Sequence, residues 1–224
     1  MKVIELHDLR FCWPNQASNT LSLDELIVMQ GEHLFIRGAS GSGKTTLLNL
    51  LAGILTPNRG QLQVLEQGLT QLSPAARDRF RADHLGIIFQ QFNLLPYLSV
   101  LDNVTLPCEF SKRRREQVGD VSATAIRLLE HLGLSTPMNT RAVTALSVGQ
   151  QQRVAVARAL IGKPELIIAD EPTSALDTDT RDHFLKLLFS EAEAQGSTII
   201  FVSHDPQIAH YFPRSLDLQQ VNSR

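Results

Sequence analysis

Cysteine and excess charge are both scarce in this sequence. The 224 residues include two cysteines, Cys12 and Cys108, which lie far apart and form no CxxC pair. Neither a zinc site nor a disulfide framework is therefore indicated, and we expect reduced thiols. Lys and Arg total 21 against 23 Asp and Glu, a formal net charge of −2. This balance gives no strong field to hold a nucleic acid backbone, so we expect no nucleic acid partner.

Long apolar runs are also missing. The most apolar stretch, 47–55, is interrupted by Asn49 and Gly53, and a membrane helix needs ~20 apolar residues. Glu5 and Asp8 occupy the place where a secretory signal has its apolar region. We expect a cytoplasmic chain that would reach a membrane only through a partner. Its 43% hydrophobic and 20% charged residues are typical of a globular protein.

Apolar runs of the kind found in buried parallel strands alternate with helical patterns, which predicts an α/β fold. An alternating stretch at 3–13 indicates an opening β-hairpin region. Strands are expected at 33–37, 61–65, 85–89, 165–169 and 197–202, and helices at 44–52, 100–110, 123–131, 150–161 and 179–194. We interpret residues 1–224 as one domain with a mixed β-sheet. It would consist of an α/β core, about 1–91 and 146–224, and a helical subdomain inserted at about 92–145.

A glycine-rich segment lies between the strand expected at 33–37 and the helix expected at 44–52. It reads GASGSGKT and matches GxxxxGK[ST] in the context that a P-loop NTPase requires. Successive backbone N–H groups would curl around the phosphates, Lys44 would reach the β- and γ-phosphates, and the Thr45 hydroxyl would bind Mg²⁺. The nucleotide-binding residues predicted here are Gly38, Ala39, Ser40, Gly41, Ser42, Gly43, Lys44, Thr45 and Thr46.

Two acidic residues follow the apolar run Leu166–Ala169. Alone, such a pair more often marks a helix N-cap. With the phosphate loop upstream, the end of a parallel strand would instead deliver both carboxylates to the nucleotide. We predict that Asp170 holds Mg²⁺ and that Glu171 orients the attacking water.

The segment Ala145–Arg153, ALSVGQQQR, resembles the signature motif of ATP-binding cassette (ABC) ATPases. Further matches follow in the family's order: Gln90 resembles its Q-loop glutamine, Ser174-Ala175-Leu176-Asp177 its D-loop, and His204 its switch histidine. Trp13 lies where the family places an aromatic ring against adenine, although Phe11 is a competing candidate. The resemblance covers residues 1–220 and implies the ABC nucleotide-binding fold.

The family's mechanism needs two cassettes that sandwich two MgATP head to tail. The resemblance implies a second copy of this chain, or a paralogous cassette, as partner. Ser147, Gly149, Gln150 and Asp177 would then complete the other copy's ATP site, while Thr45, Gln90 and Asp170 would hold Mg²⁺. Glu171 and His204 would be the catalytic residues.

An apolar segment, Phe92–Leu98, follows Gln90. In transport cassettes this region receives a helix of an integral membrane permease, and this stretch looks most like the bacterial lipoprotein-release and macrolide-export branch. We expect a peripheral location on the cytoplasmic face of the inner membrane, through that permease. Alternatives are mechanical or cell-envelope signalling work and a weakly active regulatory cassette. A chromosome-maintenance ATPase is disfavoured because no heptad run separates Lys44 from Ser147.

Two smaller expectations concern the run Lys112–Arg115 and residue Val148. The basic run is most simply a solvated helix face, which we favour over contact with lipid headgroups at a membrane. Val148 stands at a signature position that is usually glycine, and a β-branched residue is a poor occupant of a positive φ. We predict a negative φ at Val148, with its side chain directed away from the nucleotide.

Overall fold

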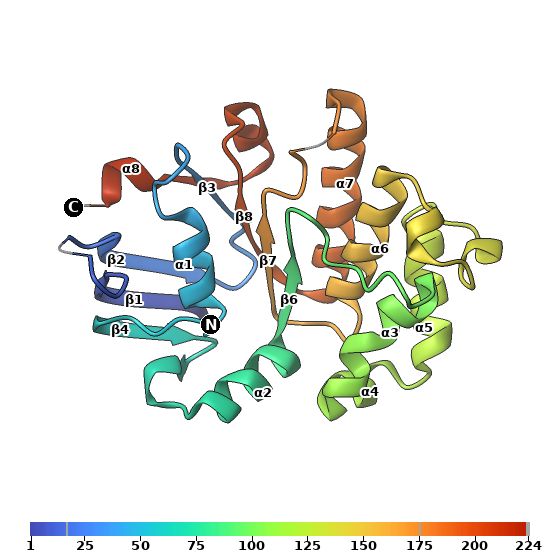
Figure 1. Ribbon diagram of the computed structural model, residues 1–224, viewed down its shortest axis with the longest axis horizontal. Helices are drawn as coiled ribbons and strands as arrows, with labels where there is room; N and C mark the ends of the chain where they lie inside the picture. Colours follow the sequence, from blue (N-terminus) through green and yellow to red (C-terminus); the bar gives the residue numbers. More distant parts are fainter. Residues whose placement is uncertain (17, 175, 223–224) are drawn as a thin grey trace. The chain divides into compact units, whose positions relative to one another are not determined.

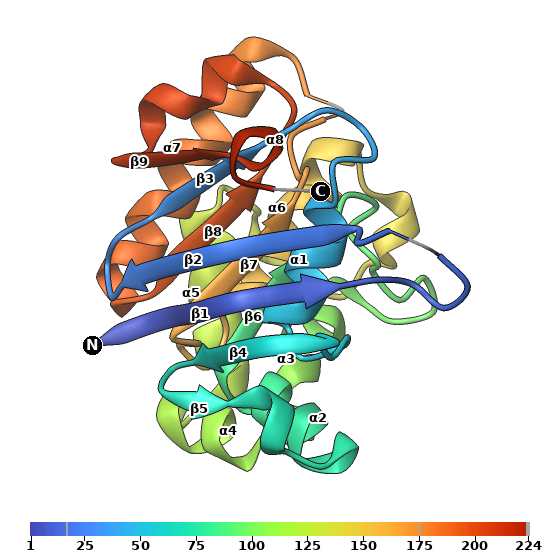
Figure 2. The same cartoon turned by 90° about the vertical axis from the view of Figure 1, so that its left-hand side faces the viewer.

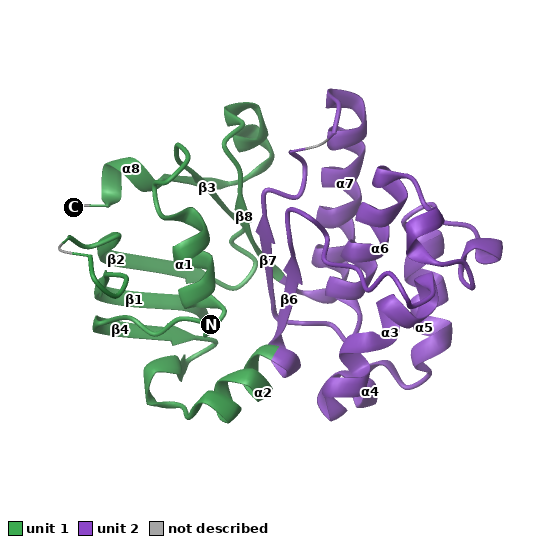
Figure 3. Cartoon of the chain, in the orientation of Figure 1, with its two compact units in different colours: residues 1–81, 198–224 green, residues 82–197 purple. Residues whose placement is uncertain are grey.

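The computed structural model describes residues 1–16, 18–174 and 176–222. The chain divides into two compact units, residues 1–81 with 198–224 and residues 82–197 (Figure 3). The division falls within helix α2 (Pro74–His84) and just before strand β8 (Thr198–Val202). These boundaries differ from those expected for the core and the helical insertion, which stay a prediction.

An antiparallel sheet of four strands forms one side of the first unit. Its order is β2-β1-β4-β5 (Figure 2). The bounds are β1 Lys2–Phe11, β2 Leu21–Met29, β4 Arg59–Val64 and β5 Gln67–Gly68. Strand β1 buries Ile4, Leu6, Leu9 and Phe11, and this apolar face lets the strand pack against the interior of the unit.

Three parallel strands complete the first unit. Strand β3 (Leu34–Arg37) pairs on one side with β8 and on the other with β9 (Arg214–Asp217). The rings of Phe35, Phe201 and Phe212 stack with centroids 5.4–6.4 Å apart, which ties the loop before β9 to the two strands. The helical segments of this unit are η1 Leu69–Gln71, α1 Lys44–Leu51, η4 Pro206–Tyr211 and α8 Leu218–Val221.

The second unit consists of two parallel strands and a group of helices (Figure 1). Strand β6 (Leu85–Ile88) pairs with β7 (Leu166–Asp170). The helices are α3 Val100–Phe110, α4 Lys112–Val118, α5 Val121–His131, α6 Val148–Leu160 and α7 Thr178–Gln195, with short turns η2 Thr136–Met138 and η3 Val143–Ala145. Helix α6 packs against α3, α5, α7 and β6 and is therefore the centre of the unit.

The basic run in α4 departs from the solvated face that we expected. Lys112, Arg113 and Arg115 are exposed, but Arg114 is 2% exposed. Its guanidinium donates to the carbonyls of Ile161, at 3.0 Å, and Leu85. Burial lowers the pKa of Arg114 to about 10. The prediction was wrong for Arg114 because the run lies on a helix, and one side of that helix faces the end of β6.

Candidate nucleotide site

The phosphate loop predicted at 38–46 joins β3 to α1 in the first unit. Gly41 and Gly43 have φ of 75° and 100°, conformations that residues with a Cβ rarely adopt. A Cβ at Gly43 would come within 2.7 Å of Leu21 Cδ2, and one at Gly38 would come within 2.5 Å of Ser42 Oγ. Small residues are therefore required for this loop to curl over the N-terminus of α1, where backbone N–H groups attract anions.

Lys44 lies inside the curled loop. Its side chain is 7% exposed and its Nζ donates to the carbonyls of Gly38 and Ala39 at 2.7 and 3.0 Å. The Ser42 hydroxyl is buried and makes no hydrogen bond in the described structure. A polar group of this kind is costly unless a ligand or water satisfies it. The lysine and this hydroxyl thus fit a phosphate group at the loop.

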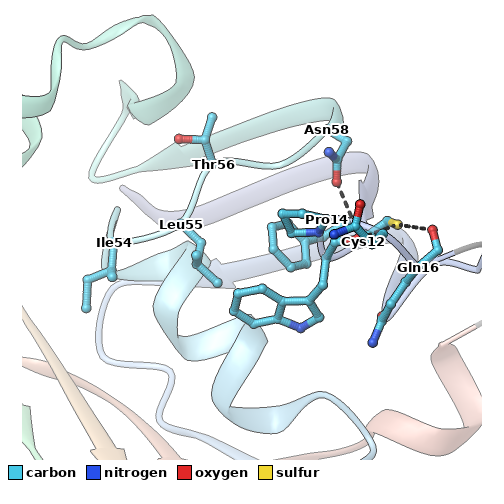
Figure 4. Close-up of a pocket in the computed structure, with 10 residues that line it drawn as sticks. Cys12, Pro14, Gln16, Ile54, Leu55, Thr56 and Asn58 are labelled. Atoms are coloured by element: carbon cyan, nitrogen blue, oxygen red, sulfur yellow. Dashed lines mark hydrogen bonds between the residues drawn. The ribbon is translucent and has the colours of Figure 1, made fainter.

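A pocket of about 560 Å³ opens beside Trp13 in the same unit. Trp13 is 39% exposed, whereas Phe11 is 5% exposed and meets the indole edge to face at 5.1 Å. The Cys12 amide donates to Asn58 Oδ1 at 2.7 Å, and its thiol donates to the Gln16 carbonyl (Figure 4). The pocket is lined by Phe11, Cys12, Trp13, Pro14, Asn15, Gln16, Ile54, Leu55, Thr56 and Asn58.

His204 lies at the carboxyl end of β8. Ile36 of β3 is level with Val202 of β8, and the same register continued by two residues aligns Gly38 with His204. The Ser203 amide donates to the Ile36 carbonyl at 3.2 Å, which extends the pairing by one step. The first unit therefore brings His204, whose side chain is exposed, to the strand end from which the phosphate loop starts.

Gln90, Asp170 and Glu171 share an edge of the β6–β7 pair in the second unit. Ile88 is level with Ala169, so the continued register aligns Gln90 with Glu171. Glu171 has a φ of 45°, a left-handed conformation that costs a non-glycine residue roughly 1–3 kcal/mol. Such strain persists where the surroundings enforce it, and it is common at functional sites.

The signature residues form the N-terminus of α6. Ser147 is the N-cap: its Oγ accepts from the Gln150 amide, and Gln150 Oε1 accepts from the Ser147 amide at 2.9 Å. The Gln150 side chain is occupied in this capping box. The Ser147 hydroxyl only accepts there, so its O–H can still donate a hydrogen bond. A Cβ at Gly149 would meet nothing within 4 Å. The described chain therefore leaves this helix end open.

The predicted backbone conformation of Val148 is confirmed, whereas the direction of its side chain relative to a nucleotide stays a prediction. Val148 is the first residue of α6, its φ is not positive, and its side chain is 52% exposed. Asp177 caps α7, where Oδ1 accepts from the Thr180 amide at 2.9 Å and Oδ2 from the Thr180 hydroxyl. These two bonds lower the pKa of Asp177. Ala175 of the expected D-loop lies outside the described residues.

The segment Phe92–Leu98 is exposed only in part. Tyr97 is 78% exposed, but Phe92 is 8% exposed and belongs to the core. The buried Asn103 of α3 shapes the segment: its Oδ1 accepts from the Leu95 amide at 2.8 Å, and its Nδ2 donates to the Leu95 carbonyl at 3.1 Å. Phe92 is therefore not available to a partner, whereas Tyr97 is.

Sequence reasoning missed four residues that hold the predicted site in place. Asn222 follows α8 and joins the first unit together: its Oδ1 accepts from the Ser22 amide, and its Nδ2 donates to the carbonyls of Thr20 and Ser42. The others are Asn103, Gln152 and Arg158. For Asn103 and Arg158 the one sequence signal was a polar residue within an apolar helical pattern, which indicates a buried partner but does not name it.

Metal binding at the predicted site requires oxygen donors. The predicted set of Thr45, Gln90 and Asp170 offers a hydroxyl, an amide and a carboxylate, the hard ligands that Mg²⁺ prefers together with water and phosphate oxygens. Among the described residues no group of three or more His, Cys, Asp or Glu could hold a metal.

None of the described helices combines the length and apolar character needed to cross a membrane.

The known proteins that this chain resembles are all ABC transporter proteins or domains. The ABC transporter family model matches residues 21–174. An uncharacterized ABC transporter ATP-binding protein, YbbA of Escherichia coli (strain K12), is 41% identical over 219 residues, which is 96% of this chain and 94% of that protein. The macrolide export ATP-binding/permease protein MacB of Escherichia coli is 39% identical over 97% of this chain, which spans 33% of that longer protein.

Solved structures agree with this assignment. The dimeric structure of the bacterial ABC transporter cassette MJ0796 matches with a TM-score of 0.84 and 33% identity, covering 96% of this chain and 94% of that one. The structure of its post-hydrolysis state bound to ADP and Pi matches equally well. The predicted fold class is therefore confirmed. This chain belongs to the ABC transporter family, of which it carries the ATPase domain.

Proposed function

We propose that this chain hydrolyses ATP to drive an integral membrane permease, through closure of a cassette dimer around two nucleotides. The observation that supports the proposal most is the phosphate loop. There a lysine that is nine-tenths buried and an unpartnered serine hydroxyl lie in a cradle that admits only small residues. Such a loop at the N-terminus of a helix binds phosphate groups.

ATP binding is assigned to residues of the first unit. The amides of 38–46 would surround the β-phosphate, and Lys44 would exchange its two carbonyl partners for phosphate oxygens. The exposed indole of Trp13 would stack on adenine. Trp13 is preferred over Phe11 for this role because Phe11 is buried.

Hydrolysis is assigned to residues at the ends of strands. Glu171 would orient the attacking water, and the exposed imidazole of His204 would contact the γ-phosphate. Thr45, Gln90 and Asp170 would hold Mg²⁺, which neutralises charge on the β- and γ-phosphates. The strained backbone at Glu171 supports a functional role for this residue.

The open end of α6 supports the dimer. Ser147 presents a hydroxyl donor, and nothing in the described chain covers Gly149. A γ-phosphate held by a second copy would find donors and a helix N-terminus there, together with Gln150 and Asp177. The dimeric structure of a related cassette and the permease fused to MacB support a dimer and a membrane partner.

The permease would contact the exposed part of Phe92–Leu98, in which Tyr97 is the most accessible side chain. Because this segment follows Gln90, a change at the γ-phosphate would pass directly to the partner. The chain would accordingly lie on the cytoplasmic face of the inner membrane.

Thermal melting with nucleotide tests the site. We expect MgATP to raise the melting temperature more than ATP with EDTA, because the metal ligands contribute only with Mg²⁺. A ligand at 100 times its Kd stabilises a protein by about 2.7 kcal/mol. Lys44→Ala should abolish the shift, whereas Lys186→Ala, an exposed lysine of α7, should not. Equal shifts with and without EDTA would count against the metal ligands, and the absence of any shift would contradict nucleotide binding.

A further inference from the structure

Left-handed residues follow both strands of the β6–β7 pair. Phe92 and Asn93 have φ of 58° and 48°, and Glu171 has a φ of 45°. None of the three is glycine, so the chain must enforce these conformations. The first pair comes directly after Gln90 and Gln91, and the third residue is Glu171 itself.

Side chains of one helix, α6, bind the backbone next to both left-handed stretches. Arg158 donates from Nη1 to the Asn93 carbonyl at 2.7 Å and from Nη2 to the Phe92 carbonyl at 2.5 Å. Gln152, which is 1% exposed, donates from Nε2 to the Pro172 carbonyl at 2.8 Å. The planar guanidinium fork can bind two successive carbonyls at once, which a lysine cannot do.

The charged guanidinium of Arg158 donates its hydrogen bonds to these backbone carbonyls. No ion pair of Arg158 is found in the described part of the chain, and burial lowers its pKa. A half-buried cation gains from such partners, and the hydrogen bonds of Arg158 go to two carbonyls that a left-handed turn presents side by side. The position near the C-terminus of α6 is also favourable for a cation.

We propose that Arg158 is a positioning residue that fixes the segment after Gln90 to the signature helix, with Gln152 doing the same for the segment after Glu171. Ser147, at the N-terminus of α6, would then move together with the loops that carry Gln90 and Glu171, because both loops are bonded to the same helix. Eleven residues of helix span about 16 Å. The inference rests on the proposed function, since it assigns Gln90 and Glu171 to the nucleotide.

Hydrogen–deuterium exchange of the nucleotide-free full chain tests this arrangement. Several amides after Gln90 are bonded within the segment or to Asn103, those of Asn93, Leu95 and Leu98 among them. We expect Arg158→Gln to speed exchange at 91–98 by about fivefold or more, while α1 and α3 exchange as in wild type. Arg158→Lys should give an intermediate rate, because lysine keeps the charge but not the fork.

Steady-state ATP hydrolysis gives a second readout. Arg158→Gln should lower kcat about tenfold and leave KM for ATP within about twofold, because the phosphate loop is unaltered. Gln152→Leu, which removes the other donor, should also lower kcat. Arg127→Gln, an exposed arginine of α5, is the matched control and should behave as wild type in both measurements.

Unchanged exchange at 91–98 in a folded Arg158→Gln protein would overturn the proposal. If that variant does not fold, Arg158→Lys decides: wild-type exchange contradicts the role of the fork, and faster exchange confined to this segment supports it. The exchange measurement needs no nucleotide, so it is independent of whether the proposed function holds. The wild-type chain could hydrolyse ATP in a way that requires Glu171 while the Arg158→Gln variant shows unchanged exchange at 91–98. That result would remove the positioning role of Arg158 and leave the proposed function intact.

Discussion

Val148 shows how a single residue can depart from a family pattern without loss of the local structure. It occupies the first position of α6, where a helical φ suits a β-branched residue, and its side chain is half exposed. We assign the contacts to the second copy's γ-phosphate to the neighbouring Ser147 and Gly149, not to Val148. The signature helix therefore begins normally with valine in place of the usual glycine.

Val148→Gly should change ATP hydrolysis by less than about tenfold, which corresponds to ~1.4 kcal/mol in the barrier. The expected effect is small because the side chain is not needed for the cap and does not strain the backbone. Steady-state hydrolysis of the two purified proteins at saturating MgATP measures it. A much larger activation would mean that valine damages the composite site, and the chain would then be a weak or regulatory ATPase.

The sequence predicted a residue's role well where a local motif determines that role, and poorly where a tertiary contact does. The phosphate loop was readable because its glycines are required locally, at Gly41 and Gly43. Arg114 was misread because a run of four basic residues does not reveal which one faces inward. Arg158 and Asn222 were missed because their partners are backbone groups distant in sequence, which a single sequence does not identify.

Strands and helices with strong periodicity were predicted closely. Helix α3 has the bounds that the pattern gave, and α1, α5, α6 and α7 differ by a few residues. Strand β2 was given no bounds although its Leu21, Leu23, Leu26 and Val28 are buried. Two weaker elements were also missed: α2 buries no residue fully, and the short β9 depends on its pairing with β3. Periodicity reports burial of a face, so an element without a buried face gives little signal.

Helix α7 offers a test at the level of one element. Asp177→Ala should lower the melting temperature, because it removes the acceptor for the Thr180 amide and hydroxyl. Asp177→Asn keeps an acceptor and should remain closer to wild type. Thermal melting monitored by circular dichroism compares the three proteins, and equal melting temperatures would show that the cap does not stabilise the helix.

The same cap predicts a pH dependence. The hydrogen bonds from Thr180 lower the pKa of Asp177 in the folded chain. Its contribution is therefore present above the unfolded pKa, about 3.9, and is lost as pH falls through the folded pKa. The difference in melting temperature between wild type and Asp177→Ala should narrow below about pH 4. If the difference in melting temperature stays constant down to pH 3, the negative charge of Asp177 does not contribute to the cap.

Across the chain, the residues that we assign to nucleotide binding and hydrolysis are divided between the two units. The phosphate loop, Trp13 and His204 belong to the first, and Gln90, Asp170, Glu171 and the signature helix to the second. The sequence motifs predicted this set because each lies at a strand end or helix start. What they did not give is the group of side chains that holds each unit's loops in place.

Binding to the permease is tested at Tyr97 and Leu95. Tyr97→Glu or Leu95→Glu should abolish co-purification with the membrane protein that a tagged wild-type chain retains from solubilised membranes, because a charge would replace the apolar contact. The thermal shift with MgATP should persist. Phe110→Glu is the matched control, since Phe110 is similarly exposed, at 74%, but lies at the far end of α3. A complex that survives both substitutions would place the docking surface elsewhere.

We propose that this chain works as an ATP-driven dimer, and the Glu171→Gln variant provides the decisive measurement. This variant keeps the phosphate contacts but loses the carboxylate that orients water, so it should bind MgATP, hydrolyse it far more slowly and accumulate as a closed dimer. Size-exclusion chromatography with light scattering should give twice the monomer mass with MgATP and the monomer mass without nucleotide. A Glu171→Gln protein that binds MgATP at saturation and remains monomeric would show that the chain does not form an ATP-bound dimer.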